Sequence, residues 1–310
     1  MKKVAFIFPG QGSQKIGMGK DFFDNSEIAK DMISKASERL GINFNELLFE
    51  ENDKIGQTEY TQPAILLVSS IANAIFNEKY DIKPEFVLGH SLGEFSALVS
   101  AGAIDYLDAI ELVHKRGKFM NEACAGAGAG MMALVGLDDK TVEDMCEEQR
   151  KNGLKVWAAN YNMDGQIVLA GLKQDLESLV DVFKEAGAKR AIVLDMSVAS
   201  HCELLQSAVE NLKPYLEEFL KDDFKYSVIS NVTANEYNTK EEAIDLLSEQ
   251  LINPVKYKHS IASKEADVDA FIEFGNGIVL KGLNRKITKK PTFNVSDFSS
   301  LNKTIEALNE

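Results

Sequence analysis

Residues 89–93 have the sequence GHSLG, which places a serine between two glycines with one residue on each side. The pattern follows the apolar run 86–88 and precedes an amphipathic stretch at 94–100. A strand, a sharp turn and a helix in this order are typical of a nucleophile elbow, in which strained backbone exposes the serine hydroxyl. A tight structural turn is the alternative. The position between a predicted strand and a predicted helix favours Ser91 as a catalytic nucleophile.

A serine nucleophile needs a base within hydrogen-bonding distance, and histidine has the most suitable pKa. The sequence holds four histidines. His90 adjoins the serine and should point away from it, His114 lies on a predicted helix, and His259 lies in a polar stretch. His201 stands where a strand and its connection lead into a helix. Elimination makes His201 the candidate base, and the alternative is a residue that only starts the helix.

Arg116 faces an apolar side of its predicted helix. The neighbours three and four positions away are all apolar: Leu112, Val113, Phe119 and Met120. A buried guanidinium needs a partner, because an isolated buried charge costs more free energy than packing returns. An internal Asp or Glu is one candidate partner. A substrate carboxylate held by two parallel hydrogen bonds is the other.

The segment 8–13, with the sequence FPGQGS, ends the first predicted strand in a glycine-rich turn. Free backbone N–H groups in this turn, together with the N–H of Leu92, would suit an oxyanion hole. Taken alone, the segment indicates no more than an ordinary strand-to-helix turn.

Short apolar runs alternate with helical patterns along the first part of the chain. Strands are predicted at 4–8 and 86–89, and helices at 28–40, 62–76, 92–100 and 105–120. This alternation is typical of a parallel sheet in an α/β fold. The sequence CAGAGAG at 124–130 then indicates a flexible link and a boundary, because its side chains have little bulk.

Beyond the link the predicted order changes to strand, helix, strand, strand, helix, strand, which is the ferredoxin-like pattern. These elements are expected at 131–137, 139–149, 156–160, 166–170, 174–186 and 190–194. The alternation of short apolar runs and helical patterns then returns, with helices at 203–213 and 241–251 and strands at 228–231, 271–274 and 292–295. We therefore expect the first and last segments to share one sheet, interrupted by the ferredoxin-like unit.

The composition argues against several classes of protein. A formal charge of −14 disfavours nucleic-acid binding, because phosphate neutralisation needs an excess of Lys and Arg. The apolar run 4–8 is too short for a signal peptide or a membrane span. Three cysteines without CxxC spacing indicate neither a disulfide framework nor a zinc site. We expect a cytoplasmic monomer that binds no metal, no membrane and no nucleic acid.

One stretch of the chain is locally basic. Residues 281–290 contain no acid and five basic side chains: Lys281, Arg285, Lys286, Lys289 and Lys290. Such a run is usually a solvated face, but it would also suit an acidic partner, as would the pair at 189–190.

Seven segments spread over almost the whole chain resemble the malonyl-CoA:acyl carrier protein transacylases of fatty-acid synthesis. They are FPGQGSQ (8–14), TQPA (61–64), GHSLGEFSAL (89–98), RGKFM (116–120), AANYN (158–162), SVASH (197–201) and QLINPV (250–255). The resemblance implies an α/β fold in which an α/β-hydrolase-like large subdomain with a parallel sheet, 1–125 and 197–310, is interrupted by a small ferredoxin-like subdomain, 126–196. The chain departs from the family at Ala199, where proline is common, and at 275–277.

The resemblance also implies a role for each residue of the site. Ser91 would be the nucleophile and His201 its base, and the backbone carbonyl of Gln250 would orient the imidazole. The backbone amides of Gln11 and Leu92 would form the oxyanion hole.

Two further residues complete the implied site: Arg116 would bind the malonyl carboxylate and Asn160 would line the cleft between subdomains. The implied reaction moves a malonyl group from malonyl-CoA, through an ester on Ser91, to the phosphopantetheine thiol of acyl carrier protein, without a cofactor. Three alternatives stay open. They are an α/β-hydrolase-type esterase or thioesterase, an acyltransferase that prefers methylmalonyl units for polyketide synthesis, and a carrier-binding subunit without catalysis.

Overall fold

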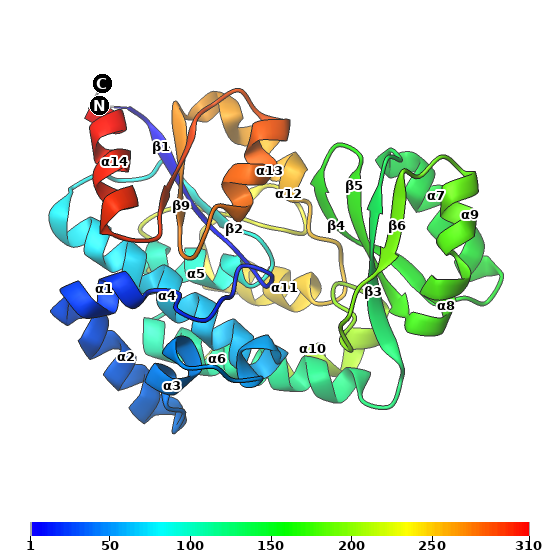
Figure 1. Cartoon of the computed structure of the whole chain (residues 1–310), viewed down its shortest axis with the longest axis horizontal. Helices are drawn as coiled ribbons and strands as arrows, with labels where there is room; N and C mark the ends of the chain where they lie inside the picture. Colours follow the sequence, from blue (N-terminus) through cyan, green and yellow to red (C-terminus); the bar gives the residue numbers. More distant parts are fainter. Residues whose placement is uncertain (1, 310) are drawn as a thin grey trace.

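The computed structural model describes residues 2–309. A six-stranded sheet with the order β10-β9-β1-β2-β7-β8 forms the centre of the larger part (Figure 1). Its strands are β1 (Val4–Phe8), β2 (Val87–Gly89), β7 (Val228–Ile229), β8 (Glu236–Tyr237), β9 (Ala270–Phe274) and β10 (Thr292–Val295). Strands β10, β9, β1, β2 and β7 are parallel, and β7 pairs with β8 antiparallel. The two ends of the chain therefore share one sheet, as the sequence predicts.

Helices cover both faces of this sheet. They are α1 (Lys20–Asn25), α2 (Glu27–Leu40), α3 (Phe44–Phe49), α4 (Thr58–Lys79), α5 (Gly93–Ala101), α6 (Tyr106–Cys124), α10 (Gln206–Phe219), α11 (Lys240–Gln250), α12 (Tyr257–Lys264), α13 (Val279–Ile287) and α14 (Phe298–Asn309). Short 3₁₀ turns lie at Lys54–Gly56, Glu203–Leu205 and Glu265–Asp267.

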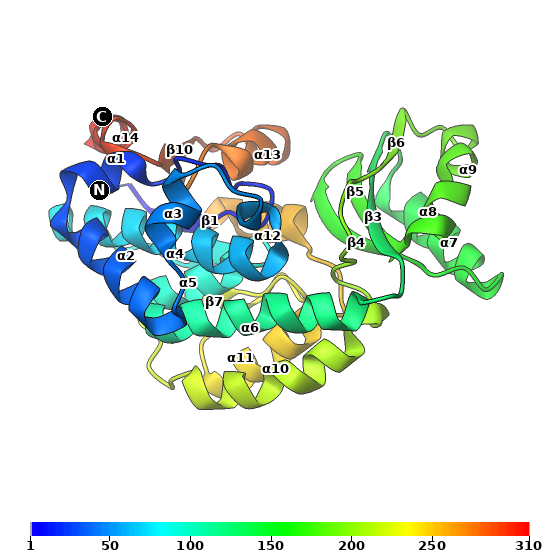
Figure 2. The same ribbon diagram turned by 60° about the horizontal axis from the view of Figure 1, so that its bottom comes forward.

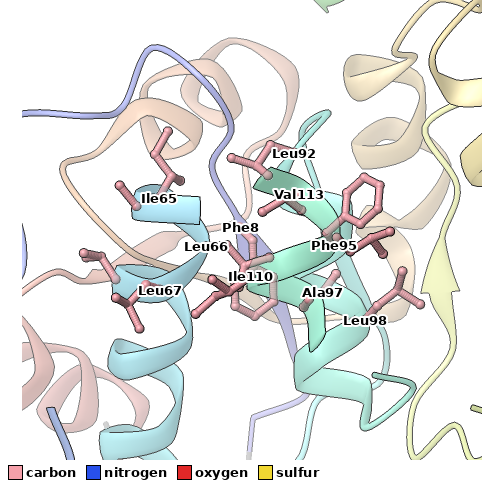
Figure 3. Close-up of a cluster of buried hydrophobic side chains, with 14 of the residues drawn as sticks. Phe8, Ile65, Leu66, Leu67, Leu92, Phe95, Ala97, Leu98, Ile110 and Val113 are labelled. Carbon is pink, nitrogen blue, oxygen red and sulfur yellow. The ribbon is translucent and has the colours of Figure 1, made fainter. Parts of the chain in front are cut away.

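Strand β1 shows why both faces must be covered. Because side chains alternate along a strand, Val4, Phe6 and Phe8 enter one apolar cluster while Ala5 and Ile7 enter another. The first cluster includes apolar side chains of α4, α5 and α6, which gather near the end of β1 (Figure 3). The second includes residues of α12 and α13. The strand that precedes the glycine-rich turn is therefore held firmly from both sides.

Helix α4 begins at Thr58, four residues earlier than predicted, and it contains Pro63. Proline has no N–H group and leaves the carbonyl four residues earlier without its helical partner. That carbonyl belongs to Glu59, and His114 Nδ1 lies 2.9 Å from its oxygen. This contact gives His114 a structural position away from the elbow.

A separate four-stranded antiparallel sheet lies at one end of the molecule (Figure 2). Its strands are β3 (Ala129–Val135), β4 (Val156–Met163), β5 (Gln166–Leu172) and β6 (Arg190–Val193), and its helices are α7 (Asp139–Lys151), α8 (Lys173–Ser178) and α9 (Val180–Glu185). The order along the sheet is β4-β5-β3-β6. This matches the predicted ferredoxin-like pattern, although the helix expected at 174–186 is divided into two at Leu179.

The link expected at 124–130 is shorter than predicted. Helix α6 continues to Cys124 and β3 starts at Ala129, so the turn occupies only 125–128. The expectation of a flexible run over all seven residues is wrong, because Cys124 belongs to α6 and Ala129 and Gly130 belong to β3. Gly126 and Gly128 have φ of 72° and 66°, which explains why glycine is needed within the turn itself. The proposed boundaries at 126 and 196 stay a prediction.

The small sheet is attached to the large part along β4. Val255 N donates to the Ala159 carbonyl at 2.8 Å, and Tyr161 N donates to the Val255 carbonyl at 2.9 Å. Lys258 adds ion pairs to Asp139 and Asp164. These contacts fix β4, and with it one wall of the cleft between the two sheets.

Candidate active site

Ser91 lies on a strained turn between β2 and α5. Its φ of 51° is in the left-handed region, which is unusual for a residue other than glycine. The Ser91 amide donates to Asn231 Oδ1 at 2.6 Å, and the Asn231 side chain donates in turn to the Gly89 carbonyl at 2.7 Å. Asn231 therefore holds the turn in a conformation that would otherwise cost free energy.

The glycines at 89 and 93 are required by close contacts. A Cβ on Gly93 would lie 2.0 Å from the Phe8 carbonyl oxygen, and a Cβ on Gly89 would lie 1.8 Å from the Gly93 carbonyl carbon. The GxSxG spacing thus lets β1, β2 and α5 meet at the nucleophile.

Replacing Gly93 by alanine should therefore distort the elbow and lower the free energy of unfolding by at least about 2 kcal/mol. Gly282→Ala is the matched control, since a Cβ on Gly282 meets nothing within 4 Å and its helix should be unchanged or slightly stabilised. Chemical denaturation of both variants measures the difference. If the two variants had equal free energies of unfolding, the close contact at Gly93 would not be what requires glycine there.

His201 contacts Ser91 directly. Ser91 Oγ lies 2.8 Å from His201 Nε2, and His201 Nδ1 lies 2.7 Å from the backbone carbonyl oxygen of Gln250. A carbonyl oxygen can only accept, so Nδ1 carries the hydrogen and Nε2 is free to accept from the serine hydroxyl. Burial, assisted by the nearby Arg116 charge, lowers the pKa of His201 to about 3. The imidazole is neutral near pH 7 and can act as a base.

The other three histidines have different partners. His90 Nε2 lies 2.7 Å from Asn162 Oδ1, and His259 Nε2 lies 3.3 Å from Asp139 Oδ2. With His114 bound to the Glu59 carbonyl, none of the three contacts the serine hydroxyl within residues 2–309.

Arg116 is 1% exposed and its guanidinium reaches the nucleophile. One terminal nitrogen donates to Gln62 Oε1 at 2.8 Å; the other donates to Gln250 Oε1 at 3.0 Å and to Ser91 Oγ at 3.3 Å. Nε has no hydrogen-bond partner among the described residues. Burial lowers the pKa of Arg116 to about 10, which still leaves it charged at neutral pH.

The expected internal ion pair is absent. Within residues 2–309 no carboxylate oxygen lies within 4.0 Å of Arg116, and both side-chain amide acceptors are neutral. An internal acid in direct contact with Arg116 is therefore wrong, and the charge of Glu94 acts on Arg116 only across the neutral Gln250 side chain. In the described part of the chain, the buried guanidinium has only neutral acceptors and a free Nε, so it can still bind the anionic group of a ligand that enters the cavity.

The residues with the other implied roles lie around the same cavity. Its volume is about 340 Å³, and its lining includes Gln11, Leu92 and Asn160 together with Ser91, Arg116 and His201. The backbone amides of Gln11 and Leu92 donate to no acceptor within residues 2–309. Asn160 is 6% exposed and belongs to β4, on the opposite wall.

A second hollow of about 700 Å³ adjoins this cavity. The two share Gln11, Gly56, Asp195 and Met196. Lys173, Gln57 and Asn121 are among the other residues that line the second hollow. The two hollows therefore adjoin in the cleft between the sheets, and Ser91 lies in the smaller one.

Sequence reasoning missed four neighbours of the site: Gln62, Asn231, Glu94 and Tyr237. Gln62 lies within the TQPA segment and Glu94 within the GHSLGEFSAL segment, so the motifs contained them without indicating a function. No pattern marked Asn231 or Tyr237. Their contacts join positions more than 130 residues apart in the sequence.

Among the described residues, no helix has the length and hydropathy that crossing a membrane requires. The same residues contain no group of three or more His, Cys, Asp or Glu arranged to hold a metal ion.

A parallel α/β sheet that presents a serine on a strained elbow, with a neutral histidine beside it, defines a protein suited to serine-based acyl chemistry. The family of the acyl transferase domain matches residues 5–290. The chain belongs to this family and, within it, to the malonyl CoA-acyl carrier protein transacylases.

Relatives over the full length support this assignment. The malonyl CoA-acyl carrier protein transacylase of Bacillus subtilis (strain 168) is 41% identical, with 100% of this chain and 98% of the relative covered. The crystal structure of the Helicobacter pylori malonyl-CoA:acyl carrier protein transacylase superposes with a TM-score of 0.96 at 45% identity, covering 100% and 99% of the two chains. A malonyl-transacylase in complex with its type II PKS acyl-carrier protein gives 0.94 at 36% identity, covering 98% and 99%.

Proposed function

We propose that this protein transfers a malonyl group from malonyl-CoA to the phosphopantetheine thiol of acyl carrier protein in fatty-acid synthesis. The observation that supports it most is the Arg116 guanidinium, which is buried, contacts no carboxylate directly within residues 2–309, and lies 3.3 Å from Ser91 Oγ. A malonyl group has a carboxylate at the end opposite its thioester, so one cavity can bind both ends. Charge-assisted, paired hydrogen bonds suit this recognition.

In the first half-reaction, Ser91 Oγ attacks the thioester carbonyl carbon while His201 Nε2 takes the hydroxyl proton. The Gln250 carbonyl holds the ring in the required tautomer through Nδ1. We propose that the backbone amides of Gln11 and Leu92 bind the oxyanion, since both line the cavity with free N–H groups. The C–S bond then breaks, and the CoA sulfur leaves with the proton from His201.

The second half-reaction runs the same steps in reverse order. The carrier's thiol gives its proton to His201 and attacks the Ser91 ester, and Ser91 recovers a proton as the new thioester forms. Each half-reaction exchanges one ester for one thioester, so neither needs an oxidant or reductant, and we propose that no cofactor takes part. Arg116 and the narrow cleft would keep the malonyl group away from water. Asn160 would line the path of the substrate.

The esterase or thioesterase alternative finds less support in this geometry. A hydrolase of this type would place an acid next to the histidine, but His201 Nδ1 faces a backbone carbonyl. It would also have no need for a buried arginine beside the serine. Selectivity between malonyl and methylmalonyl units stays part of the proposal, as do the cytoplasmic location and the monomeric state.

Transfer itself is tested with labelled malonyl-CoA and phosphopantetheinylated acyl carrier protein. We expect the label to appear on the carrier's thiol, and a carrier without phosphopantetheine to remain unlabelled. Release of free malonate without labelled carrier would favour the hydrolase alternative.

We further propose that the acidic carrier docks on basic residues at two surface sites, one on each part of the molecule. Arg285, Lys286, Lys289 and Lys290 line a surface hollow beside α13, and Lys189 and Arg190 are exposed at the start of β6. Opposite charges at such a surface mainly accelerate association.

Glu substitutions at Arg285, Lys286, Lys189 and Arg190 should lower kcat/KM for the carrier by roughly tenfold or more at low salt. The rate of Ser91 loading from malonyl-CoA should not change. Lys35→Glu on α2, which lies far from the small sheet (Figure 1), is the matched control. Unchanged transfer after reversal at both basic sites would contradict this docking surface.

A further inference from the structure

Glu94 is a buried acid that the mechanism above does not use. It is 0% exposed, lies on α5 three residues after the nucleophile, and does not line the cavity. Its Oε2 accepts from Asn231 N at 3.1 Å and Gln250 Nε2 at 2.8 Å, and its Oε1 bonds the Tyr237 hydroxyl at 2.9 Å. In its ionised form, a fully buried carboxyl with only these neutral partners needs a counter-charge.

Gln250 links this acid to Arg116. A guanidinium can only donate, so the oxygen of the Gln250 amide must face Arg116 Nη2, at 3.0 Å. Its NH₂ group must then face the other way, where it donates to Glu94 Oε2 and to the Ser91 carbonyl at 3.1 Å. One neutral side chain therefore connects the cation and the carboxyl, and Glu94 is the acid whose charge acts on Arg116.

The surroundings of Glu94 accept it in either protonation state. Asn231 N and Gln250 Nε2 are obligate donors, so Oε2 must remain an acceptor. A proton would therefore reside on Oε1. The Tyr237 hydroxyl has no other hydrogen-bond partner within residues 2–309, and it can turn from donor to acceptor without movement of any heavy atom.

The groups that face Glu94 come from four elements. Helix α6 contributes Arg116, β8 contributes Tyr237, α11 contributes the neutral Gln250, and the segment after β7 contributes the Asn231 amide. Burial raises the pKa of Glu94 to about 7, while these hydrogen bonds and the Arg116 charge act in the opposite direction.

We propose that Glu94 balances the charge of Arg116 in the empty site and takes up a proton on Oε1 when the carboxylate of an acyl group pairs with that arginine. The inference rests on the proposed function, because it assumes that Arg116 binds the malonyl carboxylate. The proton comes from solvent and returns there when the malonyl group leaves. Glu94 touches no substrate and is a positioning residue that adjusts the charge of the pocket.

This coupling has a defined sign. An incoming carboxylate disfavours ionised Glu94, so malonyl-CoA binds better to the protonated form. Affinity should therefore fall as pH rises above about 7, by roughly fivefold between pH 7 and pH 8. Acetyl-CoA has no carboxylate on its acyl group and should show no such dependence.

Calorimetry on Ser91→Ala protein, in two buffers with different ionisation enthalpies, counts the protons taken up on binding without acyl transfer. At pH 7.5 we expect malonyl-CoA to take up roughly 0.8 proton and acetyl-CoA close to none. Adding Glu94→Gln should abolish the uptake and flatten the pH dependence. Its amide can still accept from Asn231 and Gln250 and can donate to Tyr237.

Glu273→Gln is the matched control. Glu273 is also fully buried with a pKa raised to about 7 by burial, but it accepts from the amides of Leu280 and Lys281, away from Arg116. Proton uptake should persist in that variant.

Malonyl-CoA binding without proton uptake would overturn the inference and leave the proposed function intact. This result comes from the Ser91→Ala protein alone, so it does not depend on whether a Glu94 variant folds. Uptake that persists in Glu94→Gln would place the proton elsewhere, with His201 the nearest candidate, and would also overturn it. A protein that does not bind malonyl-CoA at all would overturn both proposals.

Discussion

Replacing Arg116 with alanine is expected to lower kcat/KM for malonyl loading of Ser91 by roughly 10²–10⁴-fold, while acetyl loading changes little. The guanidinium is buried and its hydrogen bonds within the protein go to neutral oxygens. We therefore expect its strongest interaction to be with the carboxylate of the bound malonyl group. Without it, the malonyl carboxylate would be buried unpaired, whereas an acetyl methyl group loses nothing. Single-turnover loading followed by intact mass measures both rates.

Two further variants sharpen this test. Arg116→Lys keeps the charge but loses the planar fork, so an intermediate loss is expected. Lys118→Ala removes an exposed cation from the same helix and should have no effect. Because Arg116 also contacts Ser91 and Gln250, the folded fraction of each variant is checked by denaturation. An equal loss of malonyl and acetyl loading in a folded Arg116→Ala protein would refute the carboxylate-binding role.

Replacing His201 with glutamine is expected to lower the rate of acyl transfer by about 10⁴-fold or more, because the Ser91 proton then has no acceptor. The fold should survive, since glutamine can still donate to the Gln250 carbonyl. The variant should bind malonyl-CoA with little change, so kcat falls and the dissociation constant does not. A loss confined to KM would indicate that His201 serves binding.

The pH dependence of wild-type protein tests the state of the same imidazole. A pKa lowered to about 3 keeps His201 neutral through the mildly acidic range. The value of kcat/KM for acetyl-CoA, which reports ionisation in the free enzyme, should therefore stay flat from pH 8 to pH 5. A histidine with an ordinary pKa of about 6.5 would instead lose roughly 30-fold at pH 5.

The fold could be predicted because its signals are local. The buried run at 4–8 and the GHSLG turn are readable from a few neighbouring residues, and both lie in the structure where the sequence places them. The ferredoxin-like order was readable for the same reason. The glycine- and alanine-rich run at 124–130 led to a wrong prediction of a seven-residue flexible link. Low side-chain bulk indicates flexibility only where no helix or strand extends into the run, and here α6 and β3 extend into its two ends.

The partners of the site residues were harder to predict because they are distant in sequence and chemically neutral. Gln62 and Gln250 reach Arg116 across 54 and 134 positions. A neutral amide produces no charge pattern, and the argument from Arg116 therefore pointed to a direct ion pair, whereas among the described residues the Gln250 amide separates Arg116 from Glu94. The orientation of Gln250, whose carbonyl faces His201 while its side chain faces Arg116 and Glu94, emerges only from the packed structure.

The central claim is that Ser91 carries the malonyl group while Arg116 selects it. Peptide mapping after exposure to an equal mixture of malonyl-CoA and acetyl-CoA tests both parts at once. We predict one malonyl ester, on the peptide that contains Ser91, in clear excess over acetyl, and complete discharge of that ester when phosphopantetheinylated carrier protein is added. An adduct on another residue, or equal malonyl and acetyl esters on Ser91, would contradict the account.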